Sequence, residues 1–331
     1  MKSIIYSLLI MCLLSAVVVA QSKVGTTAAP FLQISPGPRG QSMGEAGVAQ
    51  GDDVAALFWN PALGAGLNSN QAYFSHISWF AGIDLNYGGV LFNSGNWGNF
   101  GASFFIMNSG NIEVTTEERP EGTGDLYDVQ DMVVGLSYSR MLTDRFAIGG
   151  TFKMIRSSIW NLSASTFALD VGLTYHTPLQ PLVLGLSITN FGGEMRMWGT
   201  DNAIRFDPDP RVNGNNDGIV AYQMTHAWDL PACFRFGFSW TVWQTANHQL
   251  LMNSELLYPN NNENFVNMGM EYGLNRIWFL RAGYRQIFLA DREGGLSLGA
   301  GLKFKNVCFD YAFTDRNRLN SVQYVALGVS F

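Results

Sequence analysis

The chain has 331 residues and a formal net charge of −6, and only 14% of its residues are Asp, Glu, Lys or Arg, against about 25% in an ordinary soluble domain. Its 47% apolar content excludes disorder over most of the chain, and 20 basic against 26 acidic residues disfavour nucleic-acid binding. After residue 20 no run approaches the roughly 18 apolar residues of a membrane helix. Low charge with 36 glycines and many aromatic residues is typical of a transmembrane β-barrel.

Residues 1–20 have the pattern of a secretory signal peptide. Lys2 supplies a positive start, an apolar stretch runs from Ile4 to Val19, and small residues up to Ala20 mark a cleavage site. The alternative is an uncleaved N-terminal membrane helix. We expect an exported protein in which only Cys233 and Cys308 remain, both facing the lumen. The sequence leaves open whether these two cysteines form a disulfide.

Residues 21–69 do not alternate between apolar and polar and contain several prolines, which predicts turns and short helices. Asp52 and Asp53 are placed to cap a short helix over 54–58. Pro61 would end it, because the residue before a proline avoids helical backbone. We expect this segment to fold into the lumen of the barrel as a hatch. The alternative is a tail outside the barrel.

From Asn70 to the end of the chain, apolar and polar residues alternate with period two, which predicts β-strands. On one of them, Phe167 and Leu169 share a face opposite Asp170. We expect an all-β fold, a barrel of about fourteen antiparallel strands over residues 70–331. The predicted strands are 70–79, 83–93, 97–108, 131–141, 145–157, 164–176, 182–189, 232–243, 247–258, 264–273, 277–285, 294–304, 307–314 and 322–331.

The two faces of these strands differ in a way that separates a barrel from a soluble β-sandwich. A sandwich would pack its apolar faces together inside and expose Lys-rich and Glu-rich faces. Here the second face is small and polar and carries charges of both signs. A misplaced Arg or Lys facing lipid costs about 2–4 kcal/mol, so we expect these charges to face the lumen. They are Lys153, Asp170, Arg235, Glu255, Glu271, Arg281, Arg285, Lys303 and Asp310.

The connections between the predicted strands alternate in length. Those after even-numbered strands are short, and those after odd-numbered strands include the long segments 109–130 and 190–231. Outer-membrane barrels have short periplasmic turns and longer external loops. We therefore expect a multi-pass barrel in the bacterial outer membrane, with the long loops outside and both termini in the periplasm. Segment 109–130 is acidic, so it is either an ordinary wet surface or one that orients a basic partner.

The segment before the barrel resembles a known family. The runs 29–32, 43–49 and 58–62, with Arg39 and the Asp52-Asp53 pair, are similar to the N-terminal signature of the PorV/PorQ outer-membrane proteins. The resemblance implies a FadL-like barrel with a hatch, and the hatch residues it indicates are Pro30, Phe31, Arg39, Met43, Asn60, Pro61 and Ala62. From charge placement we expect Arg39 to pair with a lumen carboxylate, one of Asp170, Glu255, Glu271 and Asp310.

The resemblance also implies a function. A PorV-like protein would be a non-enzymatic component of type IX secretion, held in outer-membrane lipid, whose external loops bind the translocon barrel and the C-terminal domains of cargo. The candidate contact residues in the long loop are Phe191, Met195, Met197, Trp198 and Trp228. Exposed Met and Trp suit a protein-binding surface, and packing of the loop over the barrel mouth is the equal alternative.

Two other functions compete with secretion. One is a FadL-like transporter of long-chain fatty acids or other hydrophobic molecules, which would need an apolar pocket and a bulged strand. Gly88-Gly89, Gly149-Gly150 and Gly294-Gly295 are places for a bulge, or else for close packing against the hatch. The other is a purely structural barrel.

The chain shows little sign of catalytic or metal chemistry. No two of its four histidines have metal-ligand spacing, and no Ser–His pair marks a phospholipase. Within 207–218, the run from Asn213 to Gly218 resembles the start of a calcium loop, but Met224 stands where the bidentate Glu is needed. We expect no enzyme, no metal and no cofactor.

Overall fold

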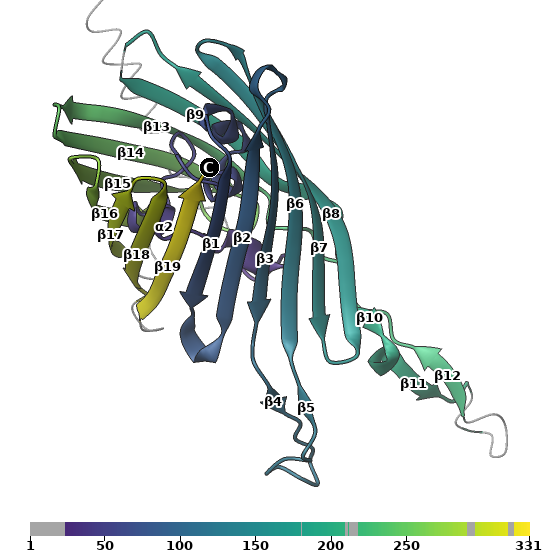
Figure 1. Cartoon of the computed structure of the whole chain (residues 1–331). Helices are drawn as coiled ribbons and strands as arrows, with labels where there is room; N and C mark the ends of the chain where they lie inside the picture. The colour runs from purple at the N-terminus through teal and green to yellow at the C-terminus, as the bar shows by residue number, and fades with distance from the viewer. Residues whose placement is uncertain (1–23, 180, 209–210, 212–217, 290–294, 317–320) are drawn as a thin grey trace, which may run out of the picture.

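The computed structural model describes residues 24–331 except 180, 209–210, 212–217, 290–294 and 317–320. The expected signal peptide at 1–20 and most of the calcium-like run lie outside the described residues. The chain forms a tilted barrel whose interior is crossed by its N-terminal segment (Figure 1). No helix in the described part of the chain is long and apolar enough to cross a membrane.

Fourteen strands make the wall, and every neighbouring pair is antiparallel. Pairing of β8 with β9 closes the barrel. The fourteen-stranded barrel predicted from the sequence is confirmed, with ends that differ by a few residues. The wall strands are β1 (Gln71–Ser78), β2 (Asp84–Asn93), β3 (Asn99–Asn108), β6 (Val129–Thr143), β7 (Phe146–Ile159), β8 (Leu162–His176), β9 (Leu182–Gly192), β13 (Cys233–Gln244), β14 (His248–Pro259), β15 (Phe265–Leu274), β16 (Trp278–Ile287), β17 (Leu296–Phe304), β18 (Val307–Asp315) and β19 (Ser321–Ser330).

Two hairpins leave the same end of the barrel, which we call the long-loop end (Figure 1). One is made by β4 (Ile112–Glu113) and β5 (Leu126–Tyr127), and the other by β11 (Ala203–Phe206) and β12 (Ile219–Tyr222). Between β9 and β11, β10 (Trp198–Gly199) pairs with the start of β8. Short 3-10 turns complete the connections: η3 (Phe80–Gly82), η4 (Gly95–Trp97) and η5 (Thr200–Asn202).

The N-terminal segment forms four short helical elements inside the wall. They are η1 (Pro30–Gln33), α2 (Pro38–Ser42), α3 (Ala56–Trp59) and η2 (Pro61–Gly66). The predicted short helix thus begins two residues later than expected. The Asp53 carboxylate accepts a hydrogen bond from the Ala56 amide at 3.2 Å. The helix ends at Asn60, whose extended backbone is the conformation that a following proline favours.

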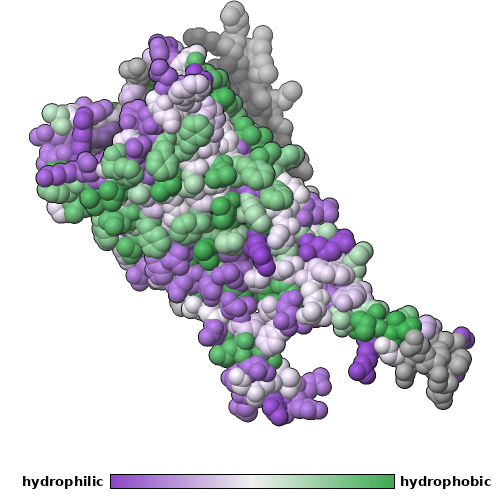
Figure 2. All heavy atoms as spheres, turned by 45° about the vertical axis from the view of Figure 1, so that its right-hand side comes forward, coloured by the Kyte–Doolittle hydropathy of each residue, from purple (hydrophilic) through white to green (hydrophobic). Residues whose placement is uncertain are grey.

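The apolar rows of the strands face outward and the charges face inward, as predicted. Phe167 is 56% exposed while Asp170 beside it is 1% exposed. Figure 2 shows the resulting hydrophobic band across the wall, with hydrophilic zones above and below it. Eight of the nine predicted lumen charges are buried. The ninth, Lys303, is exposed where it lines the lumen at the end opposite the long loops.

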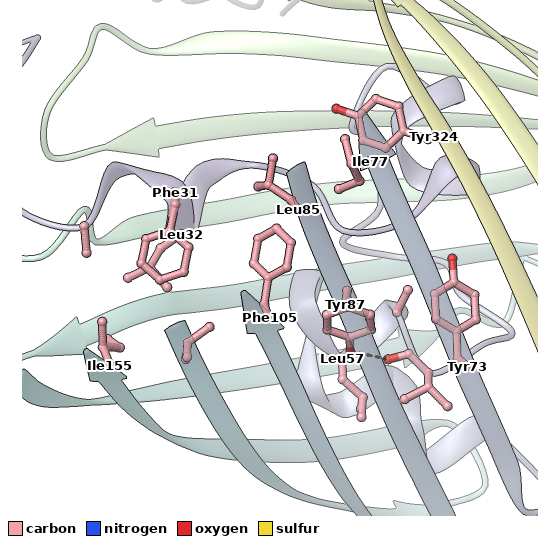
Figure 3. Packing of buried hydrophobic residues seen from close by; sticks show 14 of the residues in the cluster. Phe31, Leu32, Leu57, Tyr73, Ile77, Leu85, Tyr87, Phe105, Ile155 and Tyr324 are labelled. Carbon is pink, nitrogen blue, oxygen red and sulfur yellow. Dashed lines mark hydrogen bonds between the residues drawn. The ribbon is translucent and has the colours of Figure 1, made fainter. Parts of the chain in front are cut away.

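The lumen is not polar throughout, which differs from the expectation. Inward positions of β1 to β3 carry large apolar side chains such as Ile77, Leu85 and Phe105, and these pack against Phe31 and Leu32 of the hatch (Figure 3). Both faces of these strands are therefore apolar. One face points out of the barrel and the other packs against the hatch. Fully burying such a side chain contributes about 1.5–3 kcal/mol, so this core fixes one side of the hatch to the wall.

The two ends of the barrel sequence meet, since Gln71 pairs with Ser330. The hatch begins at the opposite end, where Ala28 donates to the Asp229 carbonyl at 2.9 Å and Thr27 accepts from Asn261 at 3.0 Å. The first described residues therefore lie at the long-loop end, and not at the end where the barrel sequence starts and finishes. The expectation that both termini lie at one end does not apply to them. The hatch runs the length of the lumen before it enters β1.

Candidate functional site

The hatch–wall interface is the first candidate site, and Asn60 lies at its centre. Its side-chain amide donates to the Val48 carbonyl at 2.8 Å and to the Leu173 carbonyl of β8 at 2.9 Å. Its oxygen accepts from the Ala62 amide at 3.0 Å. One fully buried side chain therefore joins two parts of the hatch to each other and to the wall.

Pairs of glycines facing each other across neighbouring strands receive the hatch backbone. An added Cβ at any of them would overlap a hatch atom, so only glycine leaves room there. The described residues hold three such pairs: Gly149–Gly172 against Asn60 and Pro61, Gly185–Gly237 against Val48, and Gly269–Gly283 against Met43 and Gly44.

Two of the sites proposed for a bulge are also contacts with the hatch. A Cβ at Gly149 would meet Pro61, and one at Gly89 would lie 2.8 Å from a methyl group of Val54. The pairing of β7 with β8, and of β2 with β3, has no register shift at these positions. Close packing therefore accounts for both.

Arg39 joins the hatch to the wall by charge. Its Nε and Nη2 donate to the two carboxylate oxygens of Glu271 at 3.0 and 2.9 Å. Glu271 is one of the four carboxylates predicted as partners of Arg39. Arg281 donates to the same carboxylate at 2.6 Å and continues to Asp310. Arg39 also pairs with Asp52 of the hatch.

Two further charged contacts tie the hatch to β14 and β16, and sequence reasoning missed both. The Glu45 carboxylate pairs with Arg285 at 2.9 Å. The Glu255 carboxylate accepts from the Val48 amide and from Arg235, both at 2.8 Å. Glu45 lies inside the family-like run 43–49. An acidic residue within this apolar, glycine-rich stretch is the sequence signal that indicates a buried ion pair.

Asp53 has an unusual environment at the end of the lumen opposite the long loops. Loss of hydration raises the pKa of its carboxyl group above the usual value of 3.8, and nearby Arg39 opposes that rise. Spaces bordering Arg39 and Asp53 measure only about 20 and 40 Å³, enough for about one and about three waters.

At the long-loop end the lumen opens into a cavity of about 860 Å³. The hatch forms one side through Gln33 and Ile34, and strand ends form the other, with Trp79, Arg285 and Arg316 among the lining residues. The lumen is thus hollow toward the long loops and filled around α2 and α3.

The predicted partner-binding loop is only partly a surface. Phe191, Trp198 and Trp228 are exposed, although Phe191 belongs to β9 rather than to the loop. Met195 is only 4% exposed, because its backbone pairs with Trp228 at 2.8 and 2.9 Å and directs its side chain into the core. Met197 packs against the same core. Of the two alternatives that the sequence leaves open, self-packing holds for Met195, and Met197 is partly buried.

The hairpin β11–β12 supplies exposed apolar residues that sequence reasoning missed. Phe206, Val220 and Tyr222 are exposed, and the Tyr222 ring stacks on Trp198 at 5.2 Å between centroids. Figure 2 shows hydrophobic side chains on this hairpin at the lower right. The sequence signal for this surface is the run 219–222, an apolar stretch inside a polar loop.

Comparisons with solved structures show the fold. The chain is similar to the monoaromatic hydrocarbon channel CymD, with 12% identity and a TM-score of 0.60 over 90% of this chain and 98% of that one. It is also similar to the Ralstonia pickettii toluene transporter TbuX, with 13% identity and a TM-score of 0.56 over 89% and 98%. A Pseudomonas aeruginosa FadL homologue gives 14% identity and 0.52 over 94% and 99%.

Sequence comparison finds a family match for the first part of the chain. No curated protein matches the chain, but residues 18–178 match the family model described as type IX secretion system protein PorV. That family and this fold are those of secretion and transport barrels rather than of enzymes. Residues 18–178 therefore match the PorV family, and the chain as a whole has the fold of the FadL-type β-barrels.

Proposed function

We propose that this protein is a PorV-like component of type IX secretion that binds the translocon barrel or cargo C-terminal domains through its long-loop end. The observation that carries the proposal is the contrast between the two parts of the molecule. The hatch is held by buried charges and glycine contacts, whereas the β11–β12 hairpin presents apolar side chains to solvent. Large exposed apolar patches on a folded protein mark contact with another protein or a membrane.

The expected orientation follows the rule for outer-membrane barrels. The turns 94–98, 245–247 and 275–277 are short, and the projecting hairpins lie at the opposite end. Short turns face the periplasm in such barrels, so the hairpins would face outside and Phe331 the periplasm. The hydrophobic band would then face outer-membrane lipid, and the segment 1–20 would be absent from the mature protein.

Capture from native membranes tests this function. The full chain is tagged, solubilised mildly and purified, and its partners are identified by mass spectrometry. We expect a much larger barrel or proteins that share a C-terminal domain. The double change Phe206→Ser and Val220→Ser should reduce that capture at least tenfold.

The matched control is Trp97→Ser, which removes an exposed aromatic side chain from a short turn at the opposite end. It should leave the capture intact. Recovery of the protein alone, or equal loss from both variants, would contradict binding through the hairpin.

A FadL-like transporter of hydrophobic molecules is the second candidate, and the fold shared with the CymD hydrocarbon channel and the TbuX toluene transporter favours it. Its test is direct: extraction of the purified protein and analysis of the bound lipid. Bound fatty acid together with absence of protein partners would replace the secretion role with transport.

A further inference from the structure

The cavity at the long-loop end has a lining unlike that of a pocket for an alkyl chain. Apolar Trp79 and Ile34 are there, but so are the amides of Gln33, Asn261 and Asn262. Gln33 and Asn261 bond to each other at 3.0 Å, and a side-chain amide has two N–H donors and an oxygen with two lone pairs, so it can bind further polar groups. The ligand that suits this lining therefore carries hydrogen-bonding groups of its own.

Arg316 gives the cavity a charged wall. It is only 6% exposed, and its guanidinium carbon lies 4.8 Å from the centre of the Trp79 ring, which fixes the plane of the group. Its Nη2 lies 3.8 Å from the Glu45 carboxylate, at the oxygen that Arg285 already occupies at 2.9 Å. Its Nε has no hydrogen-bond partner among the described residues.

Arg316 is the less closely paired of the two arginines in the lining. Arg285 and Arg316 line the cavity together with Glu263, and Glu45 pairs with Arg285 at 2.9 Å but lies 3.8 Å from Arg316. An arginine fork binds a carboxylate through two parallel hydrogen bonds. Arg316 has the charge for such a contact, and its Nη2 has only the long contact of 3.8 Å with Glu45.

We propose that this cavity binds a polar molecule through a carboxylate group, which Arg316 receives while the amides bind neighbouring hydrogen-bonding groups. A peptide chain end and an acidic sugar both have this chemistry. The volume of about 860 Å³ lies within the range of pockets that enclose small ligands. The inference is independent of the partner-binding role of the hairpin.

Calorimetric titration of the mature protein, purified from outer membranes in mild detergent, tests the proposal. The probes are an N-acetylated tripeptide with a free carboxylate, the same tripeptide as its amide, galacturonic acid with its amide, and oleate. We expect an acid to bind at least tenfold more tightly than its amide. If the peptide shows this preference, the carboxylate of the ligand comes from a peptide chain end. If galacturonic acid shows it, the carboxylate comes from an acidic sugar. Equal binding of acid and amide, tighter binding of oleate, or no binding at all would overturn the proposal.

Arg316→Gln isolates the group responsible. This variant should lose the preference for acid over amide, while Arg145→Gln, which removes an exposed cation at the opposite end, should keep it. The heat-induced mobility shift on gels reports whether each variant is folded. If Arg316→Gln does not fold, the acid-to-amide ratio of the natural protein still decides, because it needs no variant. Full retention of the preference in folded Arg316→Gln would contradict the assignment.

Discussion

Arg39 of the hatch and Glu271 of the wall are joined by two parallel hydrogen bonds, at 3.0 and 2.9 Å, although they lie 232 residues apart in the chain. Both side chains are largely removed from solvent. This pair lies between the glycine contacts at Met43 and the small spaces beside Asp53. It makes the position of the hatch depend on a charge in the wall.

Arg39→Gln should destabilise the protein by about 3 kcal/mol. Breaking a buried pair costs about 3–5 kcal/mol because the remaining charge is uncompensated, and Arg281 still partners Glu271, so the low end is expected. Urea titration of the barrel in lipid vesicles measures the free energy of unfolding. Arg145→Gln is the exposed control and should change it by less than about 0.5 kcal/mol. Equal stability of the two variants would contradict a structural role for the pair.

Gly283→Ala should displace the hatch. The added methyl group would overlap the backbone at Gly44, and overpacking of this kind costs about 1–3 kcal/mol. The control is Gly150→Ala, where the nearest atom to an added Cβ is 3.5 Å away, an ordinary contact. Trypsin cleavage after Arg39, read by mass spectrometry, should become faster in Gly283→Ala and not in Gly150→Ala. The opposite order would show that the hatch is not seated on these glycines.

Asn60→Ala should destabilise the protein by at least about 2 kcal/mol. The change leaves the buried carbonyls of Val48 and Leu173 without the Asn60 donor, and each unsatisfied group costs about 1–3 kcal/mol. The same urea titration applies, with exposed Asn96→Ala as control. A loss no larger than that of the control would mean that water replaces the amide and that the hatch is loosely held.

Asp53→Asn should stabilise the protein at neutral pH. Folding raises the pKa of Asp53. Between the usual pKa and the raised one, the folded state therefore binds more protons than the unfolded state. The contribution of Asp53 to the free energy of unfolding falls as the pH rises through that window. The amide keeps an oxygen that can accept from Ala56. Melting temperatures should therefore differ at pH 7 and converge toward pH 4. A variant that melts lower at pH 7 would mean that the attraction of Arg39 outweighs desolvation.

The wall could be predicted from the sequence because each strand obeys a local rule. Lipid outside and water or hatch inside impose alternation on consecutive residues such as Phe167, Ala168 and Leu169, so both the strands and their facing are readable. On β1 to β3 the same rule says nothing about the inner face. Phe105 is apolar because of Phe31, which lies far away in the chain, and no local pattern carries that pairing.

The site was predictable in outline and not in its contacts. The family-like motif marked Arg39 and Asn60, and charge placement reduced the partners of Arg39 to four carboxylates. The role of Glu45 depends on where the chain passes Arg285, and the burial of Met195 depends on its bridge to Trp228. Both are set by packing between distant segments, which one sequence does not record.

The orientation of the barrel is the central claim, since partner binding requires the hairpins to lie outside the cell. Labelling of whole cells with a membrane-impermeant maleimide measures it, using Val220→Cys on β12 and Asn96→Cys on a short turn. We predict that the Val220 variant is labelled in intact cells and the Asn96 variant only after the outer membrane is permeabilised. Labelling in the reverse order would place the hairpins in the periplasm and contradict the account.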